Sequence, residues 1–284
     1  PEKKHSFLKG KVIANLFFES STRTRVSFGL AARRLGAETI DFSPAGSSVS
    51  KGESFIDTAK NILALGVHGF IVRHSVPGTP HLLAQQLGAS IINAGDGAHQ
   101  HPTQALVDCY TVREAIGRQS FDGLNVTIVG DIKHSRVARS NIAAFTMLGA
   151  QVTLVAPPTL LPTHNAQWPV RVSHSLDDVI GVVDVVYMLR IQRERMDAAQ
   201  MPSLREYSSL FALTPERAAR MQSHALLLHP GPINRGVEMI VDPSLVPGSR
   251  ILQQVTNGIS IRMAVLFSLL GGDATTTLSN GAES

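Results

Sequence analysis

The residues best suited to chemistry lie in short polar clusters, and the first of these is Ser21-Thr22-Arg23-Thr24. This cluster separates the apolar run Val12–Phe18 from an amphipathic stretch, so it falls at a predicted junction between a strand and a helix. A helix N-terminus presents N–H groups without intrahelical partners and a partial positive charge. Hydroxyl groups and a guanidinium at that point predict a site for a phosphate group. The alternative is an ordinary Ser/Thr cap beside a surface arginine.

The other polar clusters have less specific local patterns. Arg73 ends an apolar run, which places its guanidinium either at the carboxyl edge of a sheet or in solvent. His99 and His101 have the spacing H-x-H, but without a carboxylate or cysteine partner this is weak support for a metal site, and we expect no metal. The remaining clusters are SSVSKGE at 47–53, DIKHSR at 131–136, LRIQRER at 189–195 and HPGPINR at 229–235.

Predicted strands and helices alternate along the chain, which favours parallel sheets with helices on both faces. The expected strands are Val12–Phe18, Thr39–Phe42, Gly69–Val72, Ala89–Asn93, Asn125–Val129, Gln151–Val155, Val182–Met188 and Leu226–Leu228. The expected helices are Arg23–Gly36, Phe55–Leu65, Pro77–Leu87, Pro102–Ile116, Ser135–Leu148, Ser175–Ile180 and Thr256–Leu270. Ligands of open α/β sheets bind beyond the carboxyl ends of the strands, and that is where the polar clusters fall.

The length of 284 residues suits two domains better than one. The polar stretch Gly117–Gly123 is the expected boundary, so residues 1–118 and 119–255 form the predicted domains. The last helix, within 256–284, is expected to pack back on the first domain. The fold class is therefore predicted as α/β, with two domains that each contain a parallel sheet flanked by helices.

The composition excludes several classes of protein. The net charge is only +4, aromatic residues make up 5%, and the arginines are scattered, so a nucleic-acid partner is not expected. No apolar run is long enough to span a membrane, and Cys109 is the single cysteine, which excludes an intramolecular disulfide and fits a cytoplasmic location. Small anionic substrates explain the mild positive charge better than a polyanion does.

Two of these segments resemble the signatures of the aspartate/ornithine transcarbamoylase family. FFESSTRTRVSF at 17–28 is similar to the carbamoyl-phosphate signature, and HPTQALVD at 101–108 is similar to the second. The resemblance extends from about Lys9 to Leu270. It implies two α/β domains with the active site in the cleft between them, a homotrimer whose sites are shared between neighbouring chains, and chemistry without a metal or an organic cofactor.

The resemblance also implies roles for individual residues on the carbamoyl-phosphate side. Arg73 would contact the phosphate and the carbonyl oxygen, and His101 would stabilise the oxyanion together with Arg73 and Thr24. The side-chain oxygen of Gln104 would accept from the carbamoyl NH2 group. Lys51, from the neighbouring chain, would contact both substrates, and Ser47 the phosphate, with Ser48 and Ser50 as competitors for that contact. The implied carbamoyl-phosphate site is Ser21, Thr22, Arg23, Thr24, Ser47, Lys51, Arg73, His101 and Gln104.

On the aspartate side, planar forked donors match the two carboxylates of the substrate. The resemblance implies Arg136 on one carboxylate and Arg190 with Gln192 on the other, beside Lys51. The turn Gly231-Pro232 would face the attacking amine. Ornithine enzymes are expected to carry a cysteine in the corresponding motif, so Gly231 favours aspartate as the acceptor.

The expected activity is transfer of the carbamoyl group of carbamoyl phosphate to L-aspartate, which gives N-carbamoyl-L-aspartate and phosphate in pyrimidine biosynthesis. Three alternatives stay open: another amine acceptor such as ornithine, a catalytically silent assembly partner, and an NAD-dependent dehydrogenase. The last is disfavoured because the loop GDIKHSR lacks the glycines of G-x-G-x-x-G. Regulatory chains and dihydroorotase are candidate partners. Because the sequence begins with Pro1 just before the first strand, whereas family chains begin with an additional helical segment, a truncated start is also an expectation.

Overall fold

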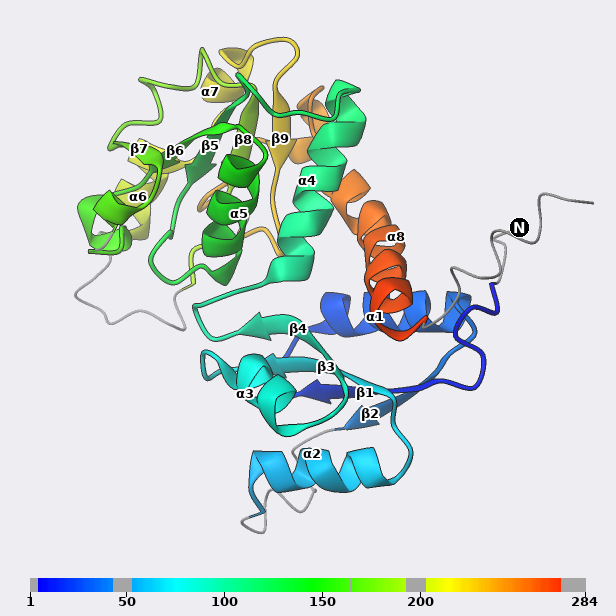
Figure 1. Ribbon diagram of the computed structural model, residues 1–284. Coiled ribbons are helices and arrows are strands. Elements are labelled where there is room, and N and C mark those ends of the chain that lie inside the picture. The colour runs from blue at the N-terminus through cyan, green and yellow to red at the C-terminus, as the bar shows by residue number, and fades with distance from the viewer. Residues whose placement is uncertain (1–4, 43–52, 164, 193–202, 272–284) are drawn as a thin grey trace, which may run out of the picture. The chain divides into compact units, whose positions relative to one another are not determined.

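The computed structural model describes residues 5–42, 53–163, 165–192 and 203–271, which form two compact units (Figure 1). The first unit comprises Pro1–Thr103 and Gly258–Ser284, and the second comprises Gln104–Asn257. Two helices, α4 (Pro102–Ile116) and α8 (Ile251–Leu270), carry the chain from one unit to the other. The expected assignment of residues 1–118 and 119–255 to two functional domains stays a prediction.

The first unit contains a four-stranded parallel sheet in the order β2-β1-β3-β4. The strands are β1 (Val12–Phe17), β2 (Glu38–Phe42), β3 (Gly69–His74) and β4 (Ser90–Asp96). The helices between them are α1 (Thr22–Arg34), α2 (Phe55–Ala64) and α3 (Thr79–Gln86).

Helices cover both faces of this sheet because successive strand residues point to opposite sides. Ile13 of β1 packs in one apolar cluster with α1 and the last turns of α8. Its neighbour Ala14 packs in a second cluster with α2 and α3. Both residues are completely buried, as expected for a parallel strand that is covered on both faces.

The second unit contains a five-stranded parallel sheet in the order β7-β6-β5-β8-β9. The strands are β5 (Asn125–Val129), β6 (Gln151–Val155), β7 (Val170–Ser173), β8 (Val185–Met188) and β9 (Leu226–Leu228). The helices are α5 (Arg136–Met147), α6 (Leu204–Phe211) and α7 (Pro215–Ala219). Short 3-10 helices occur at Pro158–Leu160, Asn165–Gln167 and Pro243–Leu245.

The strand order reverses once in each sheet. In the first unit the reversal lies between β1 and β3, and in the second it lies between β5 and β8. The loops that leave the carboxyl ends of two such strands run to opposite sides of the sheet and leave a crevice, which is the usual ligand position in this architecture. Ser21–Thr24 follows β1 and Arg73 lies near the end of β3, while the DIKHSR segment at 131–136 follows β5 and Arg190 follows β8.

The structure corrects several predicted elements. Ser175–Ile180 forms a turn rather than a helix, and its exposed Asp177 accepts hydrogen bonds from Arg217 and Arg220. Helix α8 begins at Ile251 rather than at Thr256, because its first-turn glutamines make tertiary hydrogen bonds and do not form a polar loop. Three short elements, β7, α6 and α7, were not predicted.

Candidate active site

The start of α1 has the features of an anion site. Ser21 is its N-cap residue in an extended backbone conformation, but the Ser21 side chain does not cap the helix, and the first turn contains no acidic residue. Thr24 is buried, whereas Thr22 and Arg23 are exposed. The partial positive charge of the helix end is therefore reinforced rather than offset by its own first turn.

Arg73 lies beside this helix start because of the sheet register. It is the residue of β3 that pairs with Phe17, the last residue of β1. Its Nη1 donates to the backbone oxygen of Ala94 at 3.1 Å, and its Nη2 lies 3.8 Å from a carboxylate oxygen of Glu19. These contacts hold the guanidinium at the point where the strand order of the first sheet reverses.

The loop that follows β4 is organised by Asp96, which was not predicted as a functional residue. This carboxylate accepts hydrogen bonds from Asn93 Nδ2, the backbone N–H groups of Gly78 and Gln100, and the ring nitrogen Nδ1 of His99, at 2.7–3.0 Å. Burial by itself would raise the pKa of Asp96, but these hydrogen bonds outweigh burial and hold the pKa below its usual value. The loop leads directly to His101, which is buried at the start of α4.

Gln104 follows in the first turn of α4. Its side-chain Nε2 donates to Asp108 Oδ1 at 2.8 Å, which directs the side-chain oxygen Oε1 away from Asp108. His101 immediately precedes α4, and Gln104 is the third residue of that helix. The HPTQALVD segment thus presents one ring and one amide from the same helix start.

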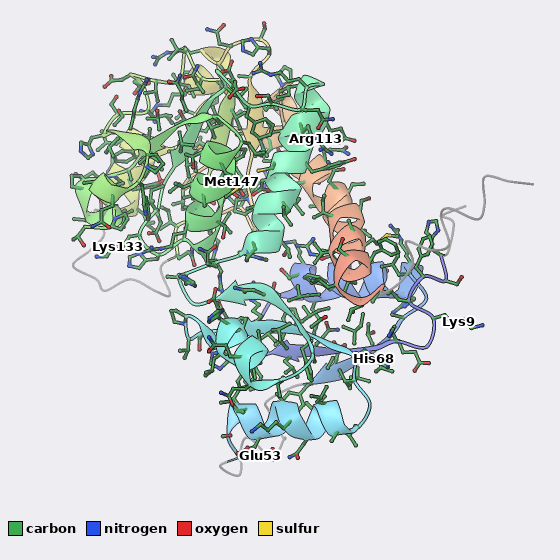
Figure 2. The ribbon with its side chains drawn as sticks, in the orientation of Figure 1. Lys9, Glu53, His68, Arg113, Lys133 and Met147 are labelled. Carbon is green, nitrogen blue, oxygen red and sulfur yellow. The ribbon has the colours of Figure 1, made fainter. Side chains whose placement is uncertain are left out.

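The loop between β5 and α5 carries the first predicted aspartate ligand. Ser135 caps α5 by accepting from the N–H group of Ala138 at 3.1 Å, and Arg136, the first helical residue, is buried. Asp131 accepts from the backbone and ring of His134 at 3.1 and 2.8 Å. Burial raises the pKa of Asp131, and the contacts with His134 oppose that shift. Lys133, labelled in Figure 2, lies in the same loop, and its N–H group donates to the oxygen of Leu160.

The segment after β8 is tied to this loop. Arg190 stands two residues beyond the strand, and Gln192 Nε2 donates to the backbone oxygen of His134 at 3.2 Å. Because β5 and β8 are adjacent and parallel, Arg136 and the Arg190–Gln192 segment leave the same edge of the sheet. Two guanidinium groups therefore occur at the point where the strand order of the second sheet reverses.

The HPGP turn after β9 is fixed by a buried pair of side chains. His229 Nδ1 accepts from the N–H group of Gly231 at 2.7 Å, so the ring proton is on Nε2, which lies 3.2 Å from Glu238 Oε1. The Gly231–Pro232 peptide bond is cis. Asn234 Nδ2 donates to the oxygen of Ile191 at 3.2 Å, which links this turn to the segment after β8.

The structure thus brings the predicted residues together in two groups, one in each unit. Ser21–Thr24, Arg73 and His101 belong to the first, and Gln104, Arg136, Arg190, Gln192, Gly231 and Pro232 to the second. Ser47 and Lys51 lie outside the described residues. Asp96, Asp108 and Asp131 were not predicted as functional residues, because their partners are set by tertiary contacts. For Asp108, its place at the end of the HPTQALVD signature was an available signal.

Two further findings concern only the described part of the chain. Its histidine, cysteine and carboxylate side chains do not form a group of three or more arranged to hold a metal ion. No helix in the same ranges has the length and apolar character needed to cross a membrane.

Family models match both halves of the chain. Residues 1–114 match the aspartate/ornithine carbamoyltransferase carbamoyl-P binding domain, and residues 122–269 match the Asp/Orn binding domain. A relative from Parafrankia sp., named aspartate carbamoyltransferase catalytic subunit, is 55% identical over 272 residues, which cover 96% of this chain and 87% of the relative. A relative of the same name from Thermobifida fusca is 55% identical over 270 residues, which cover 95% and 86%.

Solved structures give the same result. Aspartate transcarbamoylase from Trypanosoma cruzi in complex with N-(phosphonacetyl)-L-aspartic acid superposes with a TM-score of 0.85 at 31% identity, over 94% of this chain and 85% of that one. The catalytic subunit of the M. jannaschii enzyme gives a TM-score of 0.82 at 33% identity, over 99% and 90%. The chain therefore belongs to the aspartate/ornithine carbamoyltransferase family.

Proposed function

We propose that this chain is an enzyme that transfers the carbamoyl group of carbamoyl phosphate to the amine of L-aspartate, giving N-carbamoyl-L-aspartate and phosphate. The observation that carries the proposal is the placement of arginines at both points of strand-order reversal: Arg73 beside the start of α1, and Arg136 with Arg190 after β5 and β8. Relatives that are 50–55% identical bear the name of this enzyme, and the T. cruzi enzyme has been solved in complex with carbamoyl phosphate and aspartate.

Carbamoyl phosphate is held by the first group of residues together with Gln104 of the second group. The phosphate binds Ser21, Thr22, Arg23 and Thr24 at the start of α1, where N–H groups and hydroxyls converge. Arg73 spans the phosphate and the carbonyl oxygen, and His101 donates to the same carbonyl oxygen. Gln104 accepts from the carbamoyl NH2 group through Oε1, an orientation supported by its hydrogen bond to Asp108.

L-Aspartate is held by the other residues of the second group. Arg136 binds one carboxylate, and Arg190 with Gln192 binds the other, since a guanidinium fork matches a carboxylate in two parallel hydrogen bonds. Hydrogen bonds of Gln192 and Asn234 link the loops that follow β5, β8 and β9. They support this assignment because they hold the loops that carry the donors next to one another. The Gly231-Pro232 turn faces the attacking amine.

The reaction is an addition followed by elimination. The amine lone pair of aspartate forms a bond to the carbamoyl carbon, and the carbonyl becomes an oxyanion stabilised by Arg73, His101 and Thr24. The bond from carbon to the phosphate oxygen then breaks, and the amine proton passes to the departing phosphate. Positioning of the two substrates and electrostatic stabilisation supply most of the rate enhancement.

We further propose the assembly and the pathway in which this reaction takes place. The chain acts as a homotrimer in which the neighbouring chain supplies Ser47 and Lys51, with Lys51 contacting both substrates. Residues 1–118, with the C-terminal segment, bind carbamoyl phosphate, and residues 119–255 bind aspartate. The enzyme works in cytoplasmic pyrimidine biosynthesis, and regulatory chains or dihydroorotase are candidate partners.

A steady-state assay with two acceptors tests the function. Aspartate is expected to give carbamoyl aspartate, while ornithine gives no product. Arg190→Ala is expected to raise the KM for aspartate by about tenfold or more, because a charged hydrogen-bond partner of the substrate is lost. Arg171→Ala, on exposed β7, is the matched control and should leave the KM unchanged. Turnover with ornithine alone would overturn the proposed acceptor.

A further inference from the structure

Asp108 is a completely buried carboxylate with four side-chain donors. Its Oδ1 accepts from Gln104 Nε2 and Gln254 Nε2, both at 2.8 Å. Its Oδ2 accepts from Asn141 Nδ2 at 2.9 Å and from the Tyr187 hydroxyl at 2.7 Å. Burial raises the pKa of Asp108, and the four hydrogen bonds act in the opposite direction because they favour the ionised form. A buried carboxylate is costly, so its position at the end of the HPTQALVD segment calls for a function.

We propose that Asp108 is a positioning residue that orients the Gln104 amide toward the carbamoyl group and, through Gln254, holds the His229–Pro232 turn. This inference rests on the proposed carbamoyl transfer. Asp108 touches neither substrate in the proposed arrangement. It acts by fixing the orientation of the Gln104 and Gln254 side-chain amides.

The first arm is the Gln104 amide, which has an oxygen on one side and an NH2 group on the other. A partner that both donates and accepts hydrogen bonds can face either side of the amide. Only a partner that solely donates or solely accepts fixes the amide orientation. A carboxylate accepts only, so Asp108 can face only the NH2 side. Oε1 is then presented on the opposite side, where the carbamoyl NH2 group needs an acceptor. A reversed amide would set NH2 against NH2.

The second arm passes through Gln254 of α8. Its Nε2 donates to Asp108, and its Oε1 accepts from the backbone N–H group of His229 at 3.0 Å. His229 in turn accepts from the N–H group of Gly231. The same carboxylate therefore sets the direction of the amide that holds the HPGP turn, on the aspartate side of the reaction.

A purely structural role is the competing explanation, because Asp108 joins α4, α5, α8 and β8. Binding of acetyl phosphate distinguishes the positioning role from the purely structural role. Acetyl phosphate carries a methyl group where carbamoyl phosphate carries NH2, so it cannot use the Gln104 oxygen. The ratio of the two dissociation constants therefore reports amide orientation, and a general loss of packing would weaken both ligands together.

The test is isothermal titration calorimetry of the full assembled chain with each phosphate, alongside thermal unfolding. Asp108→Asn is expected to reduce the preference for carbamoyl phosphate by about tenfold, the loss of one well-formed hydrogen bond. Tyr187→Phe, which removes a donor to Oδ2 but leaves Oδ1 intact, should lower the melting temperature and keep the preference. An unchanged preference in Asp108→Asn, or the same loss in both variants, would overturn the inference.

A second variant leaves Asp108 in place and decides the matter even if Asp108→Asn does not fold. Gln104→Glu still offers an acceptor to the carbamoyl NH2 group, so it retains the preference if Gln104 acts alone. If Asp108 must hold a donor at this position, the two carboxylates repel, and the preference falls by about tenfold or more. A retained preference in Gln104→Glu refutes the positioning role. A wild-type chain without carbamoyl transfer refutes the proposed function itself, and the inference falls with it.

Discussion

His101 lies at a position where burial and the start of α4 restrict what its ring can do. It is buried immediately before Pro102, the first residue of α4, and it follows the loop fixed by Asp96. A ring held in this way can donate to a developing oxyanion without first being reoriented, which is the condition for electrostatic stabilisation of a transition state.

We predict that His101→Asn lowers kcat by about a hundredfold or more, because one oxyanion donor is lost or displaced. The KM for aspartate should change little, since the aspartate ligands lie elsewhere in the sequence. The measurement is steady-state turnover at saturating carbamoyl phosphate. His81→Asn, at an exposed position of α3, serves as the control. Near-normal turnover of His101→Asn would remove His101 from the mechanism.

A second prediction for a single residue is that Asp96 makes the stability of the fold depend on pH. Its pKa is lowered in the folded chain, so it stabilises the fold above its unfolded pKa of about 4 and loses that contribution as the pH falls through the folded pKa. Asp96→Asn should therefore lower the free energy of unfolding by about 1–3 kcal/mol near neutral pH. The difference from wild type should shrink in acid.

Chemical denaturation at pH 7 and near pH 3 checks this sign. Glu38→Gln, an exposed carboxylate at the start of β2, controls for the loss of one negative charge. A difference between Asp96→Asn and wild type that grows in acid would contradict the assigned hydrogen bonds.

At the scale of elements, the loop between β4 and α4 depends on one glycine. Gly97 has φ +53°, and a Cβ there would meet the oxygen of Ser75 at 2.7 Å and the ring of Pro77 at 2.8 Å. Gly97→Ala should therefore destabilise the chain by about 2–4 kcal/mol and displace the loop that leads to His101.

Gly66→Ala is the matched control for this loop. Gly66 has φ +93° with no atom within 4 Å of the added Cβ, so its substitution measures the backbone cost alone, about 1 kcal/mol. Thermal unfolding and turnover of both variants make the comparison. Equal losses of stability in the two variants, with normal turnover in Gly97→Ala, would show that the contacts of Gly97 with Ser75 and Pro77 do not determine the loop conformation.

Elements with strong local patterns were predictable from the sequence. Helix Pro102–Ile116 and strands Asn125–Val129, Gln151–Val155 and Leu226–Leu228 are confirmed at their predicted bounds. Strand β7 was missed because it has only four residues, half of whose positions are exposed, and so lacks a buried apolar run. The short helices α6 and α7 fall in a part of the sequence where no apolar period is long enough to decide.

The candidate site was predictable only where its residues are close together in the sequence. The run Ser21–Thr24 is contiguous, and the structure places it at a helix start as expected. Asp108 could not be assigned a role, because its partners Asn141, Tyr187 and Gln254 are 33, 79 and 146 positions away. Contacts over such separations leave no pattern in a single sequence.

At the scale of the whole molecule, the proposed sharing of sites predicts complementation between inactive chains. Lys51→Ala and His101→Asn chains should each be nearly inactive. When mixed in equal amounts and reassembled as trimers, they should regain about one quarter of wild-type activity, because one pairing of neighbours in four restores both residues to a site. Turnover of the mixture, and its mass by analytical ultracentrifugation, provide the measurement. Mixed trimers without recovered activity would place both residues in sites formed within one chain.

The most direct test of carbamoyl transfer follows the carbonyl carbon itself. Carbamoyl phosphate labelled with ¹³C is incubated with the enzyme and L-aspartate, and the label is followed by NMR together with phosphate release. We predict that the resonance moves to N-carbamoyl-L-aspartate and that one phosphate appears for each carbamoyl group transferred. Phosphate release with the label lost as carbamate or bicarbonate, or a label that stays in carbamoyl phosphate, would contradict carbamoyl transfer to aspartate.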